Sequence, residues 1–199
     1  MSRAVFLDRD GVINQSPPEG DYITAWEDFH ILPGVAEAIA LLKRAGFSVI
    51  VVTNQRCVAR GLMTDTDLEE MHRRMTDVLA RAGALVDDTY YCPHEAEPPC
   101  ECRKPAPGML LKAARSHGIE LQASWMIGDS ETDVEAGKNA GCKTARIFAA
   151  NEESNELRHS RTTAGCAEIV ATSLPEAVRR ILEWEKSSSG RFTADVTVT

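Results

Sequence analysis

Short runs of apolar residues alternate along the chain with longer stretches in which apolar residues recur every three or four positions. Runs rich in β-branched and aromatic residues are typical of strands, and the three-to-four spacing is typical of helices that bury one face. We predict strands at residues 4–7, 47–52, 89–92, 125–127, 143–148 and 168–170. We predict helices at residues 35–45, 64–82, 109–117, 132–140 and 174–185, the second of which begins at Thr64 or Thr66.

This order of elements predicts an α/β fold. Strands separated by helices pair in parallel through right-handed crossovers, and helices then cover both faces of the sheet. We therefore expect a three-layer doubly wound parallel sheet in a single domain over residues 1–185. We expect a flexible tail at 186–199 and a polar surface connection at 151–163.

Composition narrows the classes of partner. The chain has 199 residues, of which 43% are hydrophobic, and a net charge of −8 from 22 basic and 30 acidic residues. Such an acidic chain is a poor candidate for binding nucleic acid or an anionic membrane. No run approaches the roughly 20 apolar residues that cross a bilayer, and the run at 4–7 is too short for a signal peptide. We expect a cytoplasmic enzyme or binding protein.

Polar residues follow four of the predicted strands at the point where each strand ends. Asp8 and Asp10 follow the first strand, Thr53 ends the second, Cys92 ends the third and Asp129 follows the fourth. Ligands of parallel α/β sheets bind outside the carboxyl ends of the strands. We therefore expect these side chains to meet at one edge of the sheet.

The two carboxylates of Asp8 and Asp10 leave the first strand on the same side. Carboxylates so close repel each other unless a cation or a shared proton compensates, and Mg²⁺ prefers oxygen ligands such as these and Asp129. One carboxylate can attack phosphorus while the other handles the proton. The Thr53 hydroxyl can hold a phosphoryl oxygen, and Lys104 can neutralise its charge. This pattern indicates phosphoryl transfer.

A second cluster combines three cysteines with a histidine between the third strand and the next helix. Cys92, His94, Cys100 and Cys102 form a full tetrahedral set for Zn²⁺ with no open position, which is typical of a structural site. We expect zinc to order the loop at 92–104, which has no periodicity of its own.

Taken in order, the motifs over about residues 4–147 resemble the haloacid dehalogenase superfamily of phosphotransferases. The resemblance implies a nucleophile at Asp8, a general acid and base at Asp10, and phosphate-binding groups at Thr53 and Lys104. It implies that Mg²⁺ is bound by Asp8, the backbone carbonyl of Asp10, and Asp129. It places Asp133 behind the metal or against Lys104.

The zinc loop resembles a branch of this superfamily, the histidinol-phosphate and heptose-bisphosphate phosphatases, in which such a loop replaces a large cap domain. The runs Asp8-Arg9-Asp10-Gly11-Val12-Ile13-Asn14 and Tyr90-Tyr91-Cys92-Pro93-His94 are more similar to the heptose enzymes. The resemblance suggests substrate contacts at Arg9, Gly11, Asp21, Tyr22, Asn54, Gln55, Arg60 and Arg103. Arg103 can bind a second phosphate in bidentate fashion.

The resemblance implies a magnesium-dependent phosphatase that removes the 7-phosphate of D-glycero-D-manno-heptose 1,7-bisphosphate through an aspartyl-phosphate, in the synthesis of nucleotide-activated heptose. A phosphatase of histidinol phosphate, in histidine biosynthesis, is the alternative. A catalytically silent, zinc-stabilised binding module is a weaker alternative, because such a module need not keep all five predicted catalytic and metal residues. The partner would be a small phosphorylated sugar, and a domain without a large cap can act as a monomer.

Cys57 stands where the heptose enzymes usually have Gly, and we interpret it as an ordinary small side chain unless its backbone needs a positive φ. The remaining histidines have no partner by spacing, and we interpret them as surface or satisfied residues: His30, His72, His117 and His159.

Overall fold

The structure is a computed structural model that describes residues 2–18, 20–148 and 167–189. The described residues form one parallel sheet of six strands in the order β3-β2-β1-β4-β5-β6. The strands are β1 (Arg3–Leu7), β2 (Phe47–Asn54), β3 (Asp88–Cys92), β4 (Trp125–Gly128), β5 (Lys143–Ile147) and β6 (Ile169–Ala171).

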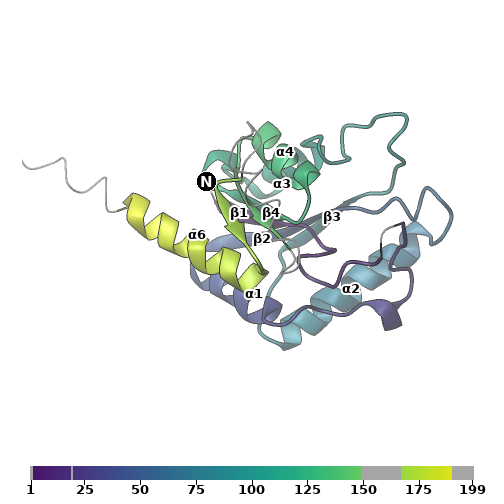
Figure 1. The fold of residues 1–199 in the computed structure, drawn as a ribbon, viewed down its shortest axis with the longest axis horizontal. Helices are drawn as coiled ribbons and strands as arrows, with labels where there is room; N and C mark the ends of the chain where they lie inside the picture. The colour runs from purple at the N-terminus through teal and green to yellow at the C-terminus, as the bar shows by residue number, and fades with distance from the viewer. Residues whose placement is uncertain (1, 19, 149–166, 190–199) are drawn as a thin grey trace, which may run out of the picture.

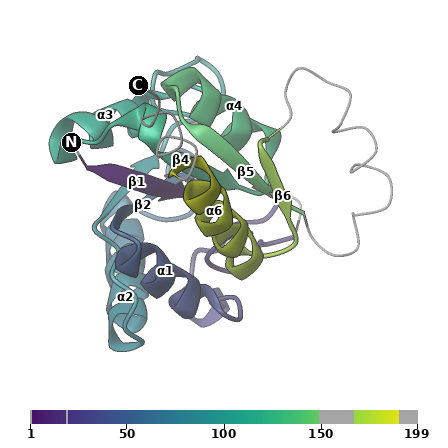
Figure 2. The ribbon, with the colours of Figure 1, turned by 90° about the vertical axis from the view of Figure 1, so that its left-hand side faces the viewer.

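Helices cover both faces of this sheet (Figures 1 and 2). They are α1 (Val35–Arg44), α2 (Asp65–Arg81), α3 (Gly108–His117), α4 (Glu131–Ala140) and α6 (Leu174–Ser189), with short 3₁₀ turns η1 (Trp26–Asp28) and η2 (Leu121–Ala123). Helices α1, α2 and α6 pack on one face, and α3 and α4 pack on the other. The expected doubly wound α/β sheet without a large cap is confirmed.

Alternate side chains of each central strand enter different cores. In β1, Val5 and Leu7 face the core under α1, α2 and α6, whereas Ala4 and Phe6 face the core under α3 and α4. All four are fully buried. Because both faces are covered, the central strands β1, β2 and β4 are recognisable in the sequence as mainly apolar runs without regular polar alternation.

Element ends differ little from the predicted ones. Helix α2 begins after Thr64, whose hydroxyl and Asp67 form a capping box. Helix α6 continues to Ser189, so the first four residues of the expected tail are helical. The connection at 151–163, the tail beyond 189 and His159 lie outside the described residues. None of the described helices is both long and apolar enough to cross a membrane.

Candidate active site

A small cavity lies at the carboxyl edge of the sheet, where β1 pairs with β2 on one side and β4 on the other. Its volume is about 230 Å³. It is lined by Asp8, Asp10, Ser16, Thr53, Asn54, Lys104, Asp129, Ser130 and Thr132. The structure therefore brings together the five residues for which the sequence indicated phosphoryl chemistry.

Lys104 is buried at the centre of this site, with 3% of its surface exposed. Its Nζ lies 2.8 Å from Asp8 Oδ1 and 2.5 Å from Asp133 Oδ1, and it donates to the Val52 carbonyl at 3.0 Å. Among the described residues, neither carboxylate oxygen has a hydrogen-bond partner besides this ammonium contact. Burial alone would lower the pKa of Lys104, but the two carboxylates raise it above its ordinary value, so the side chain stays charged.

Three carboxylates surround this ammonium and leave an excess of negative charge. Oxygens of Asp8, Asp129 and Asp133 lie within 4.8 Å of one another. Burial, with a further contribution from the neighbouring carboxylates, raises the pKa of Asp8 to about 7 and that of Asp129 to about 6, although the Lys104 ammonium opposes both shifts. A divalent cation would relieve this repulsion, and carboxylate oxygens suit Mg²⁺. The donor set therefore fits the expected magnesium.

Asp133 is fully buried, and both of its carboxylate oxygens are engaged. Oδ1 faces Lys104, and Oδ2 accepts hydrogen bonds from the Ser130 backbone N–H at 3.1 Å and hydroxyl at 2.6 Å. The residue thus holds the lysine and the turn that carries Asp129. This arrangement supports the expectation that Asp133 lies behind the metal ligands.

Gly11 lets the loop after β1 close against Asp129. Its φ is +81°, and a Cβ atom there would lie 2.1 Å from Asp129 Oδ2. Any side chain at this position would displace the carboxylate. The expected substrate contact at Gly11 could therefore come only from its backbone.

The carboxylate of Asp10 is held entirely by neighbouring side chains. Oδ2 accepts from Arg9 NH2 and from Gln55 Nε2, both at 2.9 Å, and Oδ1 accepts from Asn14 Nδ2 at 2.8 Å. Burial alone would raise the pKa of Asp10, but the Arg9 guanidinium and these hydrogen bonds lower it below its usual value. The carboxyl group is therefore ionised and fixed in position.

Arg9 and Gln55, two expected substrate contacts, lie behind the small cavity rather than on its wall. Arg9 is fully buried and Gln55 is 3% exposed, and neither lines the cavity. Gln55 Nε2 also donates to Thr53 Oγ1 at 2.9 Å, so its amide bridges Asp10 and Thr53. Both residues are engaged with the catalytic side chains, Arg9 through its guanidinium and Gln55 through Nε2.

The cysteine and histidine cluster forms as predicted. Ligand atoms of its four residues lie within 4.8 Å of one another, and the sulfur of Cys102 lies 3.2 Å from that of Cys92 and 3.5 Å from that of Cys100. These spacings fit a closed tetrahedral zinc site with Cys92, His94, Cys100 and Cys102 as ligands.

The zinc loop leads directly into two candidate site residues. Arg103 NH1 donates to the His94 carbonyl at 3.2 Å. The Asn54 side chain bonds both the N–H and the carbonyl of Lys104 at 3.1 Å, which ties the end of β2 to the loop. The cluster and Asn54 together fix the backbone from which the lysine projects.

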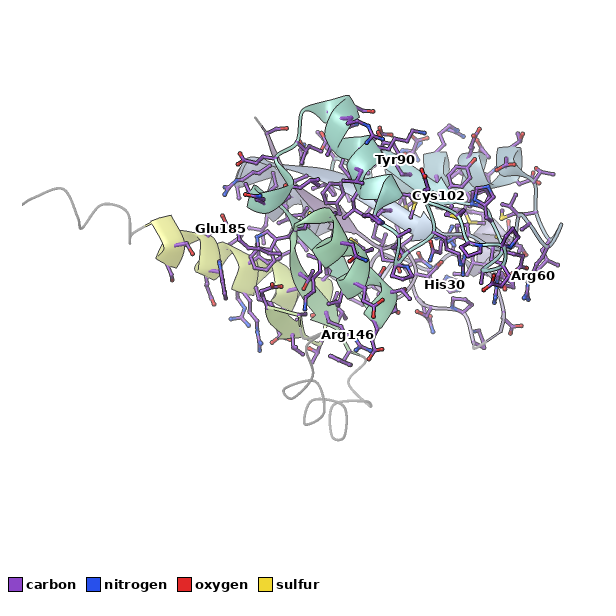
Figure 3. All side chains as sticks on the ribbon, turned by 90° about the horizontal axis from the view of Figure 1, so that it is seen from above. His30, Arg60, Tyr90, Cys102, Arg146 and Glu185 are labelled. Carbon is purple, nitrogen blue, oxygen red and sulfur yellow. The ribbon has the colours of Figure 1, made fainter. Side chains whose placement is uncertain are left out.

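A larger cavity of about 620 Å³ adjoins the first and shares Ser16 with it. Three expected substrate contacts, Asp21, Tyr22 and Arg60, line it together with His30. Figure 3 shows His30, Arg60 and Cys102 at the same end of the molecule, opposite Glu185. The Arg60 Nε is 2.7 Å from a Glu95 carboxylate oxygen.

Two buried residues behind the site could not be assigned from the sequence. Cys57 is fully buried with its sulfur 3.6 Å from Gln55 Oε1, and no described residue other than glycine has a positive φ, so its backbone is unstrained. His72 Nε2 lies 3.2 Å from Arg9 NH1. The only sequence signal for His72 was its place on the apolar face of α2, four residues after Leu68.

Comparison with known proteins identifies relatives of this chain. A family described as HAD-hydrolase-like matches residues 101–177. The D-glycero-beta-D-manno-heptose-1,7-bisphosphate 7-phosphatase of Rhodopseudomonas palustris is 44% identical over 145 residues, which cover 69% of this chain and 79% of that enzyme. The D-glycero-alpha-D-manno-heptose-1,7-bisphosphate 7-phosphatase of Mycobacterium bovis is 43% identical over 74% of this chain and 80% of that enzyme.

A solved structure shows the same architecture over almost the whole length of both chains. The D,D-heptose 1,7-bisphosphate phosphatase from B. bronchiseptica, complexed with magnesium and phosphate, aligns with a TM-score of 0.79 and 32% identity over 92% of this chain and 99% of that one. This chain belongs to the HAD-like hydrolases, in the family of the heptose-1,7-bisphosphate 7-phosphatases.

Proposed function

We propose that this protein is a magnesium-dependent phosphatase that removes the 7-phosphate of D-glycero-D-manno-heptose 1,7-bisphosphate, a step toward nucleotide-activated heptose. The observation that carries the proposal is the buried cluster of Asp8, Lys104 and Asp129 beside Asp10 in one cavity. The names of the relatives support the choice of substrate.

In this proposal Asp8 is the nucleophile. One of its oxygens contacts Lys104, which leaves the other free to attack phosphorus. As the bond to Asp8 forms, the bond to the sugar oxygen breaks. Asp10, which takes up a proton when the anionic phosphate binds beside it, gives that proton to the sugar oxygen. Asp10 then takes a proton from the water that hydrolyses the aspartyl-phosphate.

The remaining groups neutralise and orient the phosphoryl group. Thr53 Oγ1 accepts from Gln55, so its own hydrogen is available to a phosphoryl oxygen. Asp8, the backbone carbonyl of Asp10, and Asp129 would hold Mg²⁺, which supplies positive charge to the phosphoryl oxygens when bound. Lys104 stays protonated and supplies the second positive charge.

The larger cavity would receive the sugar. Arg56 and Arg60 both lie within ion-pair distance of Glu95, whereas Arg103 forms no ion pair with the described residues. We therefore assign Arg103 to the distal phosphate, which its guanidinium can bind in bidentate fashion.

The test is phosphate release with Mg²⁺ from both anomers of heptose 1,7-bisphosphate, beside histidinol phosphate and fructose 1,6-bisphosphate. We expect kcat/KM to favour a heptose anomer by a hundredfold or more. A preference for histidinol phosphate would move the protein to the alternative activity. Asp8→Asn should abolish turnover with zinc content and folding intact, whereas Asp77→Asn, at an exposed pair with Arg73, should change nothing.

A further inference from the structure

The guanidinium of Arg9 is buried between the catalytic loop and helix α2, and each of its three nitrogens has a contact. NH2 lies 2.9 and 3.0 Å from the two Asp10 oxygens, and Nε lies 3.2 Å from Oδ1. NH1 points the other way, to His72 Nε2 at 3.2 Å and Met71 Sδ at 3.8 Å. The guanidinium thus connects Asp10 with α2.

His72 must accept this hydrogen bond, because a guanidinium has only donors. The ring is therefore neutral and carries its proton on Nδ1. Only 5% of the residue is exposed, and burial together with the Arg9 charge lowers the pKa of His72 to about 3. A sulfur atom is a weak acceptor, so His72 is the one strong acceptor for NH1 among the described residues.

The direction of Arg9 in turn decides the direction of Asp10. Without an acceptor on α2, the buried NH1 group would lack a strong partner, and the guanidinium would have to turn to find another one; its other contacts are to the Asp10 oxygens. Its pairing with Asp10 would then change, and Asn14 and Gln55 alone would hold that carboxyl group.

We propose that His72 is a positioning residue for the phosphatase reaction: by accepting from Arg9, it keeps the guanidinium paired with Asp10 and so fixes where that carboxyl group meets the leaving-group oxygen. This role rests on the proposed function of Asp10. It predicts a defect that depends on how much the leaving group needs a proton. A sugar alkoxide needs one as the bond breaks, and a nitrophenolate does not.

The test compares His72→Leu, which has no acceptor, with His72→Gln, whose Oε1 reaches about as far as the imidazole Nε2. Removing a partner that orients a metal ligand typically costs about 10- to 100-fold in activity, and we expect a loss of the same size for the contact that orients Asp10. We expect His72→Leu to lower kcat/KM for heptose 1,7-bisphosphate by that factor and for para-nitrophenyl phosphate by less than about threefold, and His72→Gln to restore most of the loss. The kcat/KM for the aryl ester reports only steps up to phosphoryl transfer, which makes it insensitive to hydrolysis of the intermediate.

Leu79→Ala is the stability control, since Leu79 is buried on the same helix away from Arg9. Leu79→Ala should lower Tm and leave both kcat/KM values unchanged.

If His72→Leu does not fold, His72→Asn replaces it, because its shorter amide does not reach Arg9. Equal losses for both substrates, no loss, or a His72→Gln variant as poor as His72→Leu would overturn the proposal. If the wild-type protein hydrolyses histidinol phosphate but not the heptose ester, only the choice of substrate is overturned. The His72 variants are then compared on histidinol phosphate and para-nitrophenyl phosphate.

Discussion

A single ammonium group joins three segments of the site. Lys104 contacts Asp8 after β1, the Val52 carbonyl in β2 and Asp133 in α4. Removing one member of a buried group of paired charges destabilises the folded protein, because it leaves the remaining charge buried without its partner. The residue therefore serves both the chemistry and the cohesion of the carboxyl edge.

His72 gives a prediction about pH and stability. Its pKa in the folded protein is about 3, whereas an unfolded chain has the ordinary value of about 6.5. Because the unfolded state gains the proton first, the stability due to the neutral ring is full above about pH 6.5 and is lost as the pH falls toward 3. At pH 5 the loss is about 2 kcal/mol. We expect the free energy of unfolding of the wild type, relative to that of His72→Gln, to fall by this amount between pH 7 and pH 5, as measured by urea unfolding. A difference that does not change with pH would contradict the prediction.

At the scale of elements, the loop after β1 offers a matched pair of glycines. Gly11 and Gly20 both have positive φ, but a Cβ would meet Asp129 at 2.1 Å only from Gly11, and nothing within 4 Å from Gly20. Each Ala substitution should lower the free energy of unfolding by about 1 to 2 kcal/mol, because a residue with a side chain is strained at a positive φ. Gly11→Ala should in addition raise the magnesium concentration needed for half-maximal activity by roughly tenfold or more, whereas Gly20→Ala should not. Equal magnesium titrations would show that the Gly11 contact has no effect on the metal.

The zinc loop joins β3 to α3 and carries Lys104 just after its last ligand. Loss of the metal should release the loop backbone from which the lysine projects. We expect Cys100→Ser to lose bound zinc and about 10- to 100-fold in kcat/KM, as measured by metal analysis and phosphate release. Cys142→Ala, at a buried cysteine outside the cluster, should keep one zinc per chain. Full activity without zinc would contradict this role.

At the scale of the whole molecule, Glu185 ties α6 to three strands. Its carboxylate contacts Arg3 in β1 at 2.8 Å, and Trp125 in β4 and Lys143 in β5 at 3.0 Å. Hydrogen bonds to a charged group are worth about 1.5 to 3 kcal/mol when partly buried.

Glu185→Gln should therefore lower the free energy of unfolding by about 1 to 2 kcal/mol without changing kcat/KM. Glu183→Gln, at an exposed pair with Arg179, should have almost no effect. Chemical unfolding measures the free energy of unfolding of each variant, and phosphate release measures its kcat/KM. Similar stability of the two variants would show that the contacts of Glu185 contribute little.

The sheet and the catalytic cavity could be predicted because each depends on local pattern. Buried parallel strands appear as apolar runs, and the residues that follow them must meet at one edge. The direction of Arg9 could not be predicted, because it depends on His72 in another element, 63 residues along the chain. The inward turn of the Gln55 amide could not be predicted for the same reason, since it depends on Asp10 and Thr53 in other positions of the site. The end of α6 was missed because serines near a helix end carry little signal.

The strand order has a consequence for synthesis on the ribosome. The first three strands form one half of the sheet, β3-β2-β1, and the free edge of β1 gains its neighbour only when β4 emerges. Until then an apolar strand edge stays open to pairing with other chains, as such edges are prone to do. Asp133 arrives later still, with α4, so until then Lys104 lacks one of its two carboxylate partners. The catalytic cavity is thus incomplete in the nascent chain until Asp129 and Asp133 have been translated, when four of the six described strands have been made.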